Sequence, residues 1–245
     1  MKTVGIIPAR LESTRLPKKA LADIHGMPMV IHTCKRALLA ESLEEVYLAT
    51  DSEEIKMIAE NYDIKVIMTS SKHKNSSERA GEACSQIDAD IVVNIQGDEP
   101  LVYPRHIDLI TKSLLKNPEI QVSIGVTKFS KCNSYSDIKA VIDKNGDLIY
   151  CSRSDIPHYY LKERGFLWKL CFIVPHRRKW LEKYLEWKPS ANELIEDNHF
   201  LRLTENGVKI RTIEIDDATI SVDTPEDLME VKKLMEEDPL VRSYL

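Results

Sequence analysis

A short segment near the start of the chain, residues 8–19, concentrates side chains that could bind phosphate. Its sequence is Pro8-Ala9-Arg10-Leu11-Glu12-Ser13-Thr14-Arg15-Leu16-Pro17-Lys18-Lys19, which contains four cations. Arginine offers a bidentate fork and lysine a mobile charge, while hydroxyls and backbone N–H groups add donors, as a polyphosphate requires. Neither GxGxxG nor GxxxxGK[ST] occurs here, so a dinucleotide fingerprint and a P-loop fit poorly. A polyphosphate site and a solvated basic loop both stay open.

A carboxylate follows a later apolar run. Asp98 stands in Gln96-Gly97-Asp98-Glu99-Pro100, shortly after Ile91-Val92-Val93. Gly97 lets the backbone come close to a ligand. Mg²⁺ commonly binds through one or two carboxylates and substrate phosphate oxygens, so Asp98 facing the cationic segment would be a magnesium ligand. An aspartate of an ordinary turn is the alternative.

A second carboxylate precedes the last expected helix, in Ser221-Val222-Asp223-Thr224-Pro225-Glu226-Asp227. Thr224 can be the N-cap, Pro225 then falls at N1, and Asp227 at N3 completes a capping box. Asp223 is left without a local structural task. We therefore expect it to be a second carboxylate for the metal.

Other polar residues indicate a ligand-binding role less clearly. Ser76 and Arg79 open a helix and could reach a base or phosphate, although an N-cap serine with an exposed charge pair is as good an interpretation. Arg153 offers a cation for a carboxylate, or lies in a surface loop. The seven histidines lack metal-ligand spacing and the five cysteines form no C-x-x-C, so we expect neither a zinc site nor a disulfide framework.

The elements that must position these residues follow from hydrophobic periodicity. Continuous apolar runs predict strands at residues 3–8, 45–50, 65–69, 91–96 and 121–127, separated by amphipathic helices. This pattern predicts an α/β fold with a doubly wound, mostly parallel sheet, whose carboxyl edge binds the ligand. The later part predicts a hairpin turning at 144–147, a strand at 169–174, helices at 177–187 and 192–205, a strand at 208–215 and a helix from 225. We expect one domain, residues 1–245, with an excursion at roughly 139–220.

Composition and hydropathy argue against several classes of protein. A net charge of −5 argues against a dedicated nucleic-acid binder, which usually has a basic domain. No apolar run approaches the roughly 20 residues that a membrane helix needs. The N-terminus is also too polar for a signal peptide. We expect a cytoplasmic protein that acts without membrane or nucleic acid.

Taken together, the motifs resemble the 3-deoxy-manno-octulosonate cytidylyltransferase family. The resemblance is carried by Pro8-Ala9-Arg10, Ser13-Thr14-Arg15-Leu16-Pro17 with Lys19, Gln96-Gly97-Asp98-Glu99-Pro100, Ser152-Arg153 with Ile156-Pro157, and Val222-Asp223-Thr224-Pro225-Glu226-Asp227-Leu228. It implies a Rossmann-like nucleotidyltransferase that moves CMP from CTP to the anomeric hydroxyl of an acidic sugar and releases pyrophosphate, in lipopolysaccharide biosynthesis. It also implies a Mg²⁺ cofactor and a homodimer built through the excursion.

The resemblance implies a role for each candidate residue. We expect Lys19, Asp98, Asp223 and Arg15 to be catalytic, and Asp98 and Asp223 to bind Mg²⁺. The nucleotide is expected to contact Pro8, Ala9, Arg10, Ser13, Arg15, Lys19, Ser76, Arg79 and Gln96. The sugar is expected to contact Gln96, Arg153, Glu193, Glu196 and His199.

The chain departs from the family pattern at clustered positions. The family's Ser-Gly-Thr is here Asn75-Ser76-Ser77, and the glycine before the catalytic lysine is Lys18. The His-Leu-Gly-Ile-Tyr-Gly-Tyr-Arg stretch is here Leu170-Cys171-Phe172-Ile173-Val174-Pro175-His176-Arg177, and a Glu-Gln pair is His199-Phe200. The nucleotide and metal half is kept, whereas the acceptor half changes towards apolar and imidazole groups.

Three other functions remain open. The acceptor could be a different acid, such as another modified nonulosonate or octulosonate or a phosphonate, because losing hydroxyl-binding partners changes which acceptor is tolerated. The protein could instead be a catalytically inactive, CTP-binding regulatory protein. A dinucleotide-dependent dehydrogenase would fit the fold but lacks the fingerprint.

Overall fold

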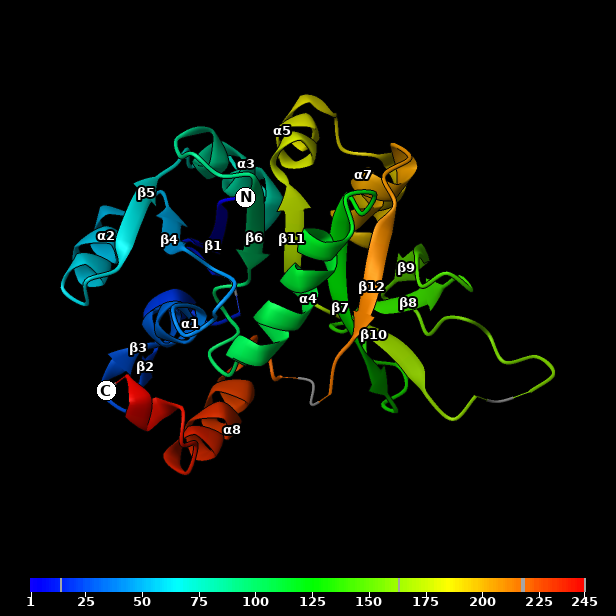
Figure 1. The fold of residues 1–245 in the computed structure, drawn as a ribbon. Coiled ribbons are helices and arrows are strands. Elements are labelled where there is room, and N and C mark those ends of the chain that lie inside the picture. Colours follow the sequence, from blue (N-terminus) through cyan, green and yellow to red (C-terminus); the bar gives the residue numbers. More distant parts are fainter. Residues whose placement is uncertain (14, 163, 217–218, 245) are drawn as a thin grey trace.

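The computed structural model describes residues 1–13, 15–162, 164–216 and 219–244. Its centre is a ten-stranded sheet with the order β5-β4-β1-β6-β11-β7-β10-β8-β9, in which β12 pairs with β7 (Figure 1). The cationic segment follows β1, and Asp98 follows β6, which pairs with β1 in parallel. The two motifs therefore meet at one edge of the sheet, as the sequence predicts.

The N-terminal half of the sheet is parallel. Its strands are β1 (Thr3–Ala9), β4 (Glu45–Thr50), β5 (Lys65–Met68) and β6 (Ile91–Ile95). The helices of this half are α1 (Met29–Ala37), α2 (Glu53–Glu60), α3 (Ser76–Ser85) and α4 (Pro104–Lys116). Buried side chains of α1, α2 and α4 pack on one face of the sheet. Those of α3 and of α5 (Arg178–Glu186) pack on the other. Both faces are covered, which explains the continuous apolar strands.

The C-terminal half is mainly antiparallel. It contains β7 (Val122–Phe129), β8 (Lys139–Ile142), β9 (Leu148–Ser152), β10 (Leu167–Cys171), β11 (Ile173–Arg177) and β12 (Ile210–Glu214). The β8–β9 hairpin confirms the predicted turn, where Gly146 adopts φ 84°. The single strand predicted at 169–174 is wrong. β10 pairs with β7 and β8, and after Phe172 the chain continues as β11 between β6 and β7. An apolar sequence does not show where a strand ends and the next one pairs with different neighbours.

The helix predicted at 192–205 is interrupted. The structure has α6 (Ala191–Glu196) and α7 (Phe200–Glu205), separated by Asp197 in the left-handed region at φ 46° and ψ 50°. Aspartate and asparagine tolerate this region better than most residues. Asn198 Oδ1 accepts a hydrogen bond from the Phe200 N–H at 3.3 Å, and its Nδ2 contacts Cys151 Sγ at 3.1 Å. The break turns Asp197 and His199 towards the site described below.

The last helix, α8 (Pro225–Glu236), begins with the predicted capping box: Thr224 accepts from the Asp227 N–H, and Asp227 accepts from the Thr224 N–H. It packs with the short hairpin of β2 (Asp23–Ile24) and β3 (Met27–Pro28) in an apolar cluster that includes Ile24, Met29, Val222 and Val231. A 3₁₀ turn, η2 (Val241–Ser243), follows. Docking of α8 brings Asp223 back to the N-terminal half of the sheet.

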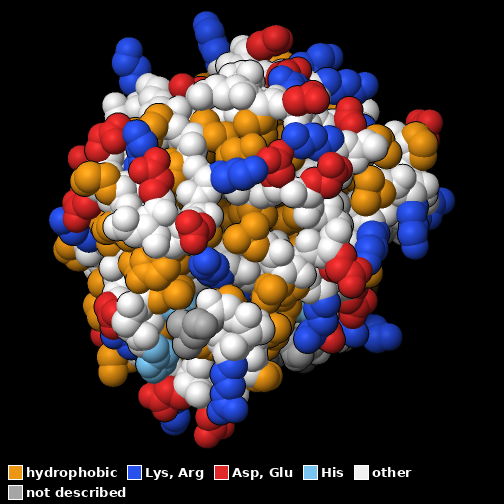
Figure 2. All heavy atoms as spheres, turned by 60° about the vertical axis from the view of Figure 1, so that its left-hand side comes forward, with side chains coloured by type: hydrophobic (Ala, Val, Ile, Leu, Met, Phe, Trp, Pro, Cys, Tyr) orange, Lys and Arg blue, Asp and Glu red, His pale blue; other side chains and the backbone are white. Residues whose placement is uncertain are grey.

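Two general features bear on partners. Among the described helices, none has both the length and the apolar character that crossing a bilayer requires. On the face drawn in Figure 2, cationic and anionic side chains are interspersed rather than separated into fields of one sign.

Candidate active site

Two adjoining cavities lie at the end of β1 and β6. The first has a volume of about 350 Å³ and the second about 660 Å³. The residues that line both are Arg15, Gln96, Asp98, Arg153, Asp197 and His199. Two ligands placed in these cavities would therefore meet at this shared wall.

The cationic segment enters the first cavity with three of its four cations. Arg10, Arg15 and Lys19 line it, together with Ser13. Lys18 does not: it lies in the left-handed region at φ 53° immediately before the 3₁₀ turn η1 (Lys19–Leu21), and its ammonium pairs with Glu54 at 2.8 Å. The left-handed conformation gives a physical reason for a glycine at this position. Thr14, which also belongs to this segment, lies outside the described residues.

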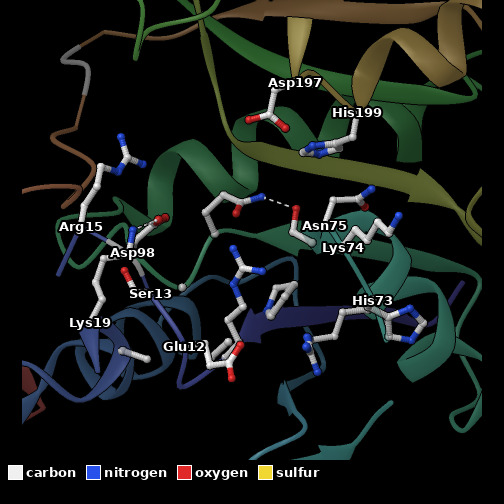
Figure 3. Close-up of a pocket in the computed structure, with 18 of the residues that line it drawn as sticks. Glu12, Ser13, Arg15, Lys19, His73, Lys74, Asn75, Asp98, Asp197 and His199 are labelled. Atoms are coloured by element: carbon white, nitrogen blue, oxygen red, sulfur yellow. Dashed lines mark hydrogen bonds and ion pairs between the residues drawn. The ribbon is translucent and has the colours of Figure 1, made fainter. Parts of the chain in front are cut away.

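The two predicted metal carboxylates converge on one ammonium. Lys19 Nζ lies 2.6 Å from Asp98 Oδ2 and 3.1 Å from Asp223 Oδ1, and Arg15 Nη2 donates to the same Asp223 oxygen at 2.8 Å. Burial alone would lower the pKa of Lys19, but the neighbouring Asp98 and Asp223 carboxylates raise it above its ordinary value. Lys19 is thus a firmly charged group that lines the first cavity beside Asp98, which lines both cavities (Figure 3).

These carboxylates are also the candidates for holding a cation. Hard divalent cations prefer carboxylate oxygens, and Mg²⁺ is typically held by one or two of them together with substrate phosphate. Within the described residues there is no group of three or more His, Cys, Asp or Glu side chains arranged for a metal ion. Two carboxylates suit a metal ion whose remaining ligands come from the substrate rather than one coordinated by protein alone.

Backbone close to the first cavity is tightly packed. A Cβ on Gly97 would lie 2.8 Å from the Pro8 carbonyl oxygen, so only glycine fits there. Pro8, Ala9 and Gly97 all line the cavity. They come from the adjacent ends of β1 and β6 and form the wall expected to contact the nucleotide.

The start of α3 forms the facing wall. Asn75, rather than Ser76, is the N-cap, since its Oδ1 accepts from the Glu78 N–H at 2.9 Å. The Ser76 hydroxyl is left to accept a hydrogen bond from Gln96 Nε2 at 2.7 Å (Figure 3). Gln96 reaches both cavities, so this bond orients a carboxamide at their junction.

Arg79 lines the first cavity but is held by protein. It is 4% exposed, donates to Thr69 Oγ1 at 2.7 Å and pairs with Asp51 at 3.4 Å. The fixed guanidinium stabilises this wall. Among the described residues, Arg10 and the ammonium of Lys74 line the same cavity and have no protein acceptor. The sequence predicts Arg10 but not Lys74, which lies in a loop of ordinary polar composition.

The second cavity has a different lining. Four apolar side chains, two lysines and several acids belong to it and not to the first cavity: Phe129, Ile138, Phe172, Ile220, Lys131, Lys169, Asp137, Asp223, Asp227 and Glu230. Lys169 pairs with Asp137 at 2.6 Å. Of this set the sequence predicts only Asp223, because Asp227 and Glu230 lie on α8 and the others at strand ends and in loops, which only the tertiary fold brings together.

Only some of the departures from the family pattern reach this cavity. Leu170 and Val174 are fully buried in the core and line neither cavity. Phe172, between them in the chain, does face the second cavity and stacks on Phe200 with a centroid distance of 5.7 Å and an interplanar angle of 5°. The second cavity therefore has an aromatic wall.

Arg153 and His199 occupy the shared wall, as expected for sugar-binding positions. Arg153 donates to the carbonyl oxygens of Tyr135 at 3.0 Å, Glu196 at 2.9 Å and Asp197 at 2.9 Å, so most of its donors hold the surrounding loops. His199 Nε2 is buried and finds no partner among the described residues. Burial, with a smaller effect of nearby cations, lowers the pKa of His199 to about 4, which keeps the imidazole neutral at pH 7. Figure 3 shows Asp197 and His199 across the cavity from Lys19.

Two predicted sugar contacts are not supported. Glu193 is 6% exposed, completes the capping box at Ser190, and binds Arg202 at 2.6 Å. Glu196 accepts from Ser152 Oγ at 2.6 Å and from the Arg153 N–H at 3.0 Å. Neither carboxylate lines a cavity, because both are occupied in holding α6 and the break after it.

Known proteins share both the sequence and the fold. Residues 4–210 match the family model for cytidylyltransferases. The chain is 38% identical to a 3-deoxy-manno-octulosonate cytidylyltransferase of Geobacter metallireducens over 245 residues, covering 94% of this chain and 96% of that one. It is 35% identical to the Escherichia coli enzyme of the same name, covering 97% of each chain.

A solved structure extends the match. CMP:2-keto-3-deoxy-manno-octonic acid synthetase in complex with CTP superposes with a TM-score of 0.92 at 35% identity, covering 97% of this chain and 99% of that one. A cytidylyltransferase of Leptospira borgpetersenii, at 19% identity and a TM-score of 0.67, shares the fold alone. By sequence, fold and the arrangement of its site, this chain belongs to the cytidylyltransferase family that includes the 3-deoxy-manno-octulosonate cytidylyltransferases.

Proposed function

We propose that the protein transfers CMP from CTP to the anomeric hydroxyl of an acidic sugar of the 3-deoxy-manno-octulosonate type, with release of pyrophosphate. One observation carries the proposal: Lys19, Asp98 and Asp223 converge where a cationic cavity meets a second cavity. Relatives named for this reaction, and a structural relative in complex with CTP, support the choice of substrates.

The arrangement suits a direct displacement. The acceptor hydroxyl releases its proton to solvent as its oxygen attacks the α-phosphorus, a new P–O bond forms, and the bond to the pyrophosphate oxygen breaks. Such a reaction needs positioning and charge neutralisation rather than a protein nucleophile. Arg10, Arg15 and Lys19 would neutralise the triphosphate, and Lys19 would stabilise the charge that grows on the leaving pyrophosphate.

The proposal includes Mg²⁺ held by Asp98 and Asp223. The donor set favours it, because both carboxylates present oxygens to the same small region beside the phosphate-binding cations. When bound, the ion would neutralise phosphate charge and lower the pKa of the attacking hydroxyl. Lys19 hydrogen-bonds to both carboxylates and Arg15 pairs with Asp223, so these two cations hold the two acids close together.

The second cavity suits an acidic acceptor. Lys131 offers a cation for a carboxylate, and Lys169 adds a second that is shared with Asp137. The stacked Phe172 and the neutral His199 favour a second candidate, transfer to a different acid such as a modified nonulosonate, octulosonate or phosphonate. An inactive CTP-binding protein is less favoured, since binding alone has no use for two convergent carboxylates.

We also propose that two copies pair through the excursion. Large apolar side chains are exposed there: Ile149 (58%), Leu194 (70%), Ile195 (81%), Tyr160 (86%) and Leu161 (92%). β9 lies at one end of the sheet order, and exposed edge strands of this kind are usually protected by pairing or by cover. The supply of CTP favours the cytoplasm as the site of the reaction.

The proposal is tested with purified protein, CTP, Mg²⁺ and a panel of sugar acids. We expect pyrophosphate release and a CMP-linked product, identified by mass spectrometry, with 3-deoxy-manno-octulosonate or a close analogue. Efficient turnover of that acid would remove the second candidate. CTP binding without pyrophosphate release for every acid would instead identify a regulatory protein.

A further inference from the structure

The two carboxylates at Lys19 come from segments that share no strand pairing in the described structure. Asp98 follows β6, whereas Asp223 lies between β12 and α8, and β12 pairs with β7. One backbone hydrogen bond joins the segments: the Val222 N–H donates to the Asp98 carbonyl oxygen at 3.0 Å. A single bond beside a polar cavity does not by itself fix a side chain.

Glu99 adds a polar attachment to the apolar packing of Leu101 with Val222. Its Oε2 accepts a hydrogen bond from Thr219 Oγ1 at 2.6 Å, and its Oε1 accepts one from the Ser221 hydroxyl. Glu99 is 6% exposed, and it forms no ion pair among the described residues. A buried carboxylate without a cation is costly unless its oxygens are hydrogen-bonded. Both of its oxygens are satisfied by one short segment, 219–221, which leads directly to Asp223.

The other end of this attachment is rigid. The Glu99 N–H donates to the Gln96 carbonyl at 3.2 Å, and the Glu99 carbonyl accepts from the Val102 N–H at 3.0 Å. Gly97 in the same turn lies against the Pro8 carbonyl at the end of β1. The turn is therefore fixed to the strand from which the cationic segment starts.

From this geometry we infer that Glu99 is a positioning residue for the transfer reaction. Through Thr219 and Ser221 it sets where Asp223 stands relative to Asp98 and Lys19. Glu99 lines neither cavity, so it does not contact substrate itself. The inference rests on the proposed function, which assigns Asp223 to the magnesium and phosphate side of the site.

The first test is kinetic. Glu99→Gln keeps the shape of the side chain but replaces one acceptor oxygen with an amide donor. We expect kcat to fall about tenfold to a hundredfold, as for a misplaced catalytic group, and the Mg²⁺ concentration for half-maximal rate to rise. Glu186→Gln is the matched control, because Glu186 is an exposed glutamate on α5 that lines neither cavity. Unchanged kcat and Mg²⁺ dependence in Glu99→Gln would overturn the inference.

The second test asks whether Glu99 acts through Asp223. On an Asp223→Asn background, Glu99→Gln should lower kcat by less than twofold more, since the group that it positions is already disabled. An equal loss in both backgrounds would contradict this. If Glu99→Gln does not fold, Ser221→Ala and Thr219→Val remove the two hydroxyl contacts separately, and retention of full kcat in both would overturn the inference.

The third test does not depend on turnover. Calorimetric titration with CTP should give the same affinity for Glu99→Gln and the parent protein in EDTA, whereas the gain in affinity on adding Mg²⁺ should be lost in the variant. An unchanged gain would overturn the inference. If the parent releases no pyrophosphate with any acid, the proposed function fails, but this comparison still decides the role of Glu99.

Discussion

The Lys19 ammonium lies 3.1 Å from an Asp223 carboxylate oxygen, although 204 residues separate the two in the chain. Closing such a long loop costs conformational entropy, so the contact depends on structure elsewhere. The parallel pairing of β1 with β6 brings Lys19 beside Asp98, and docking of α8 on the β2–β3 hairpin returns Asp223 to the same place. The arrangement of Lys19, Asp98 and Asp223 therefore depends on the packing of both ends of the chain.

Removing either carboxylate should abolish most of the activity. For Asp98→Asn and for Asp223→Asn we expect turnover to fall about a hundredfold or more, the scale of one lost preorganised charge contact. Steady-state pyrophosphate release measures this. Asp88→Asn, an exposed aspartate outside both cavities, is the control and should keep parental turnover. Near-parental turnover in either site variant would exclude that carboxylate from the reaction.

Replacing the shared ammonium should separate its two effects. Lys19→Met removes the cation that Asp98 and Asp223 share and leaves only Arg15, which pairs with Asp223, so we expect a lower Tm than the parent in EDTA. Mg²⁺ should raise the Tm of the variant more than that of the parent. The kcat of the variant should remain about a hundredfold or more below the parental value even with Mg²⁺ present. Differential scanning fluorimetry with and without Mg²⁺ checks this. An equal Mg²⁺ shift in both proteins would show that the ion does not bind between these carboxylates.

Relieving the backbone strain at Lys18, next to the proposed catalytic Lys19, should leave the activity intact. Lys18 adopts φ 53°, a conformation that costs a side-chain-bearing residue about 1 kcal/mol, and its exposed pair with Glu54 contributes little in return. Lys18→Gly should leave the free energy of unfolding unchanged or raise it by up to about 1 kcal/mol, with parental kcat. Lys18→Ala, which keeps the strain and loses the ion pair, should be the less stable variant in urea denaturation. The reverse order would mean that the ion pair outweighs the strain.

Acid should destabilise the fold partly through a buried histidine. His176 is fully buried, and burial lowers its pKa from 6.5 to about 4. Because the unfolded chain binds a proton more readily, this residue contributes stability above about pH 6.5 that is lost progressively as the pH falls towards 4, up to about 3 kcal/mol. The difference in unfolding free energy between pH 7 and pH 4.5 should therefore be smaller in His176→Gln than in the parent. Equal differences would contradict the shifted pKa.

Much of the N-terminal half could be predicted from the sequence. Parallel strands covered on both faces are continuous apolar runs, and such runs identified β1, β4, β5 and β6. Asp98 could be placed because it follows a strand, and Asp223 because Thr224 and Asp227 already satisfy the helix start. Local chemistry determines these features, so local sequence reveals them.

The C-terminal half was less predictable because its features depend on distant partners. The run 169–174 divides into two strands where the chain changes neighbours, and the break at Asp197 depends on contacts of Asn198 with β9. The sequence placed Glu193 among the expected sugar contacts, but in the structure its carboxylate is paired with Arg202. Residues of the second cavity, such as Phe172, come together only in the tertiary fold.

The most direct test is a crystal structure of the protein with CTP and Mn²⁺, in which anomalous scattering locates the metal. We expect one manganese at the junction of the two cavities, coordinated by Asp98, Asp223 and a phosphate oxygen, with the Lys19 ammonium in contact with the triphosphate. A manganese bound elsewhere, with Lys19 still paired to both carboxylates beside bound CTP, would contradict it.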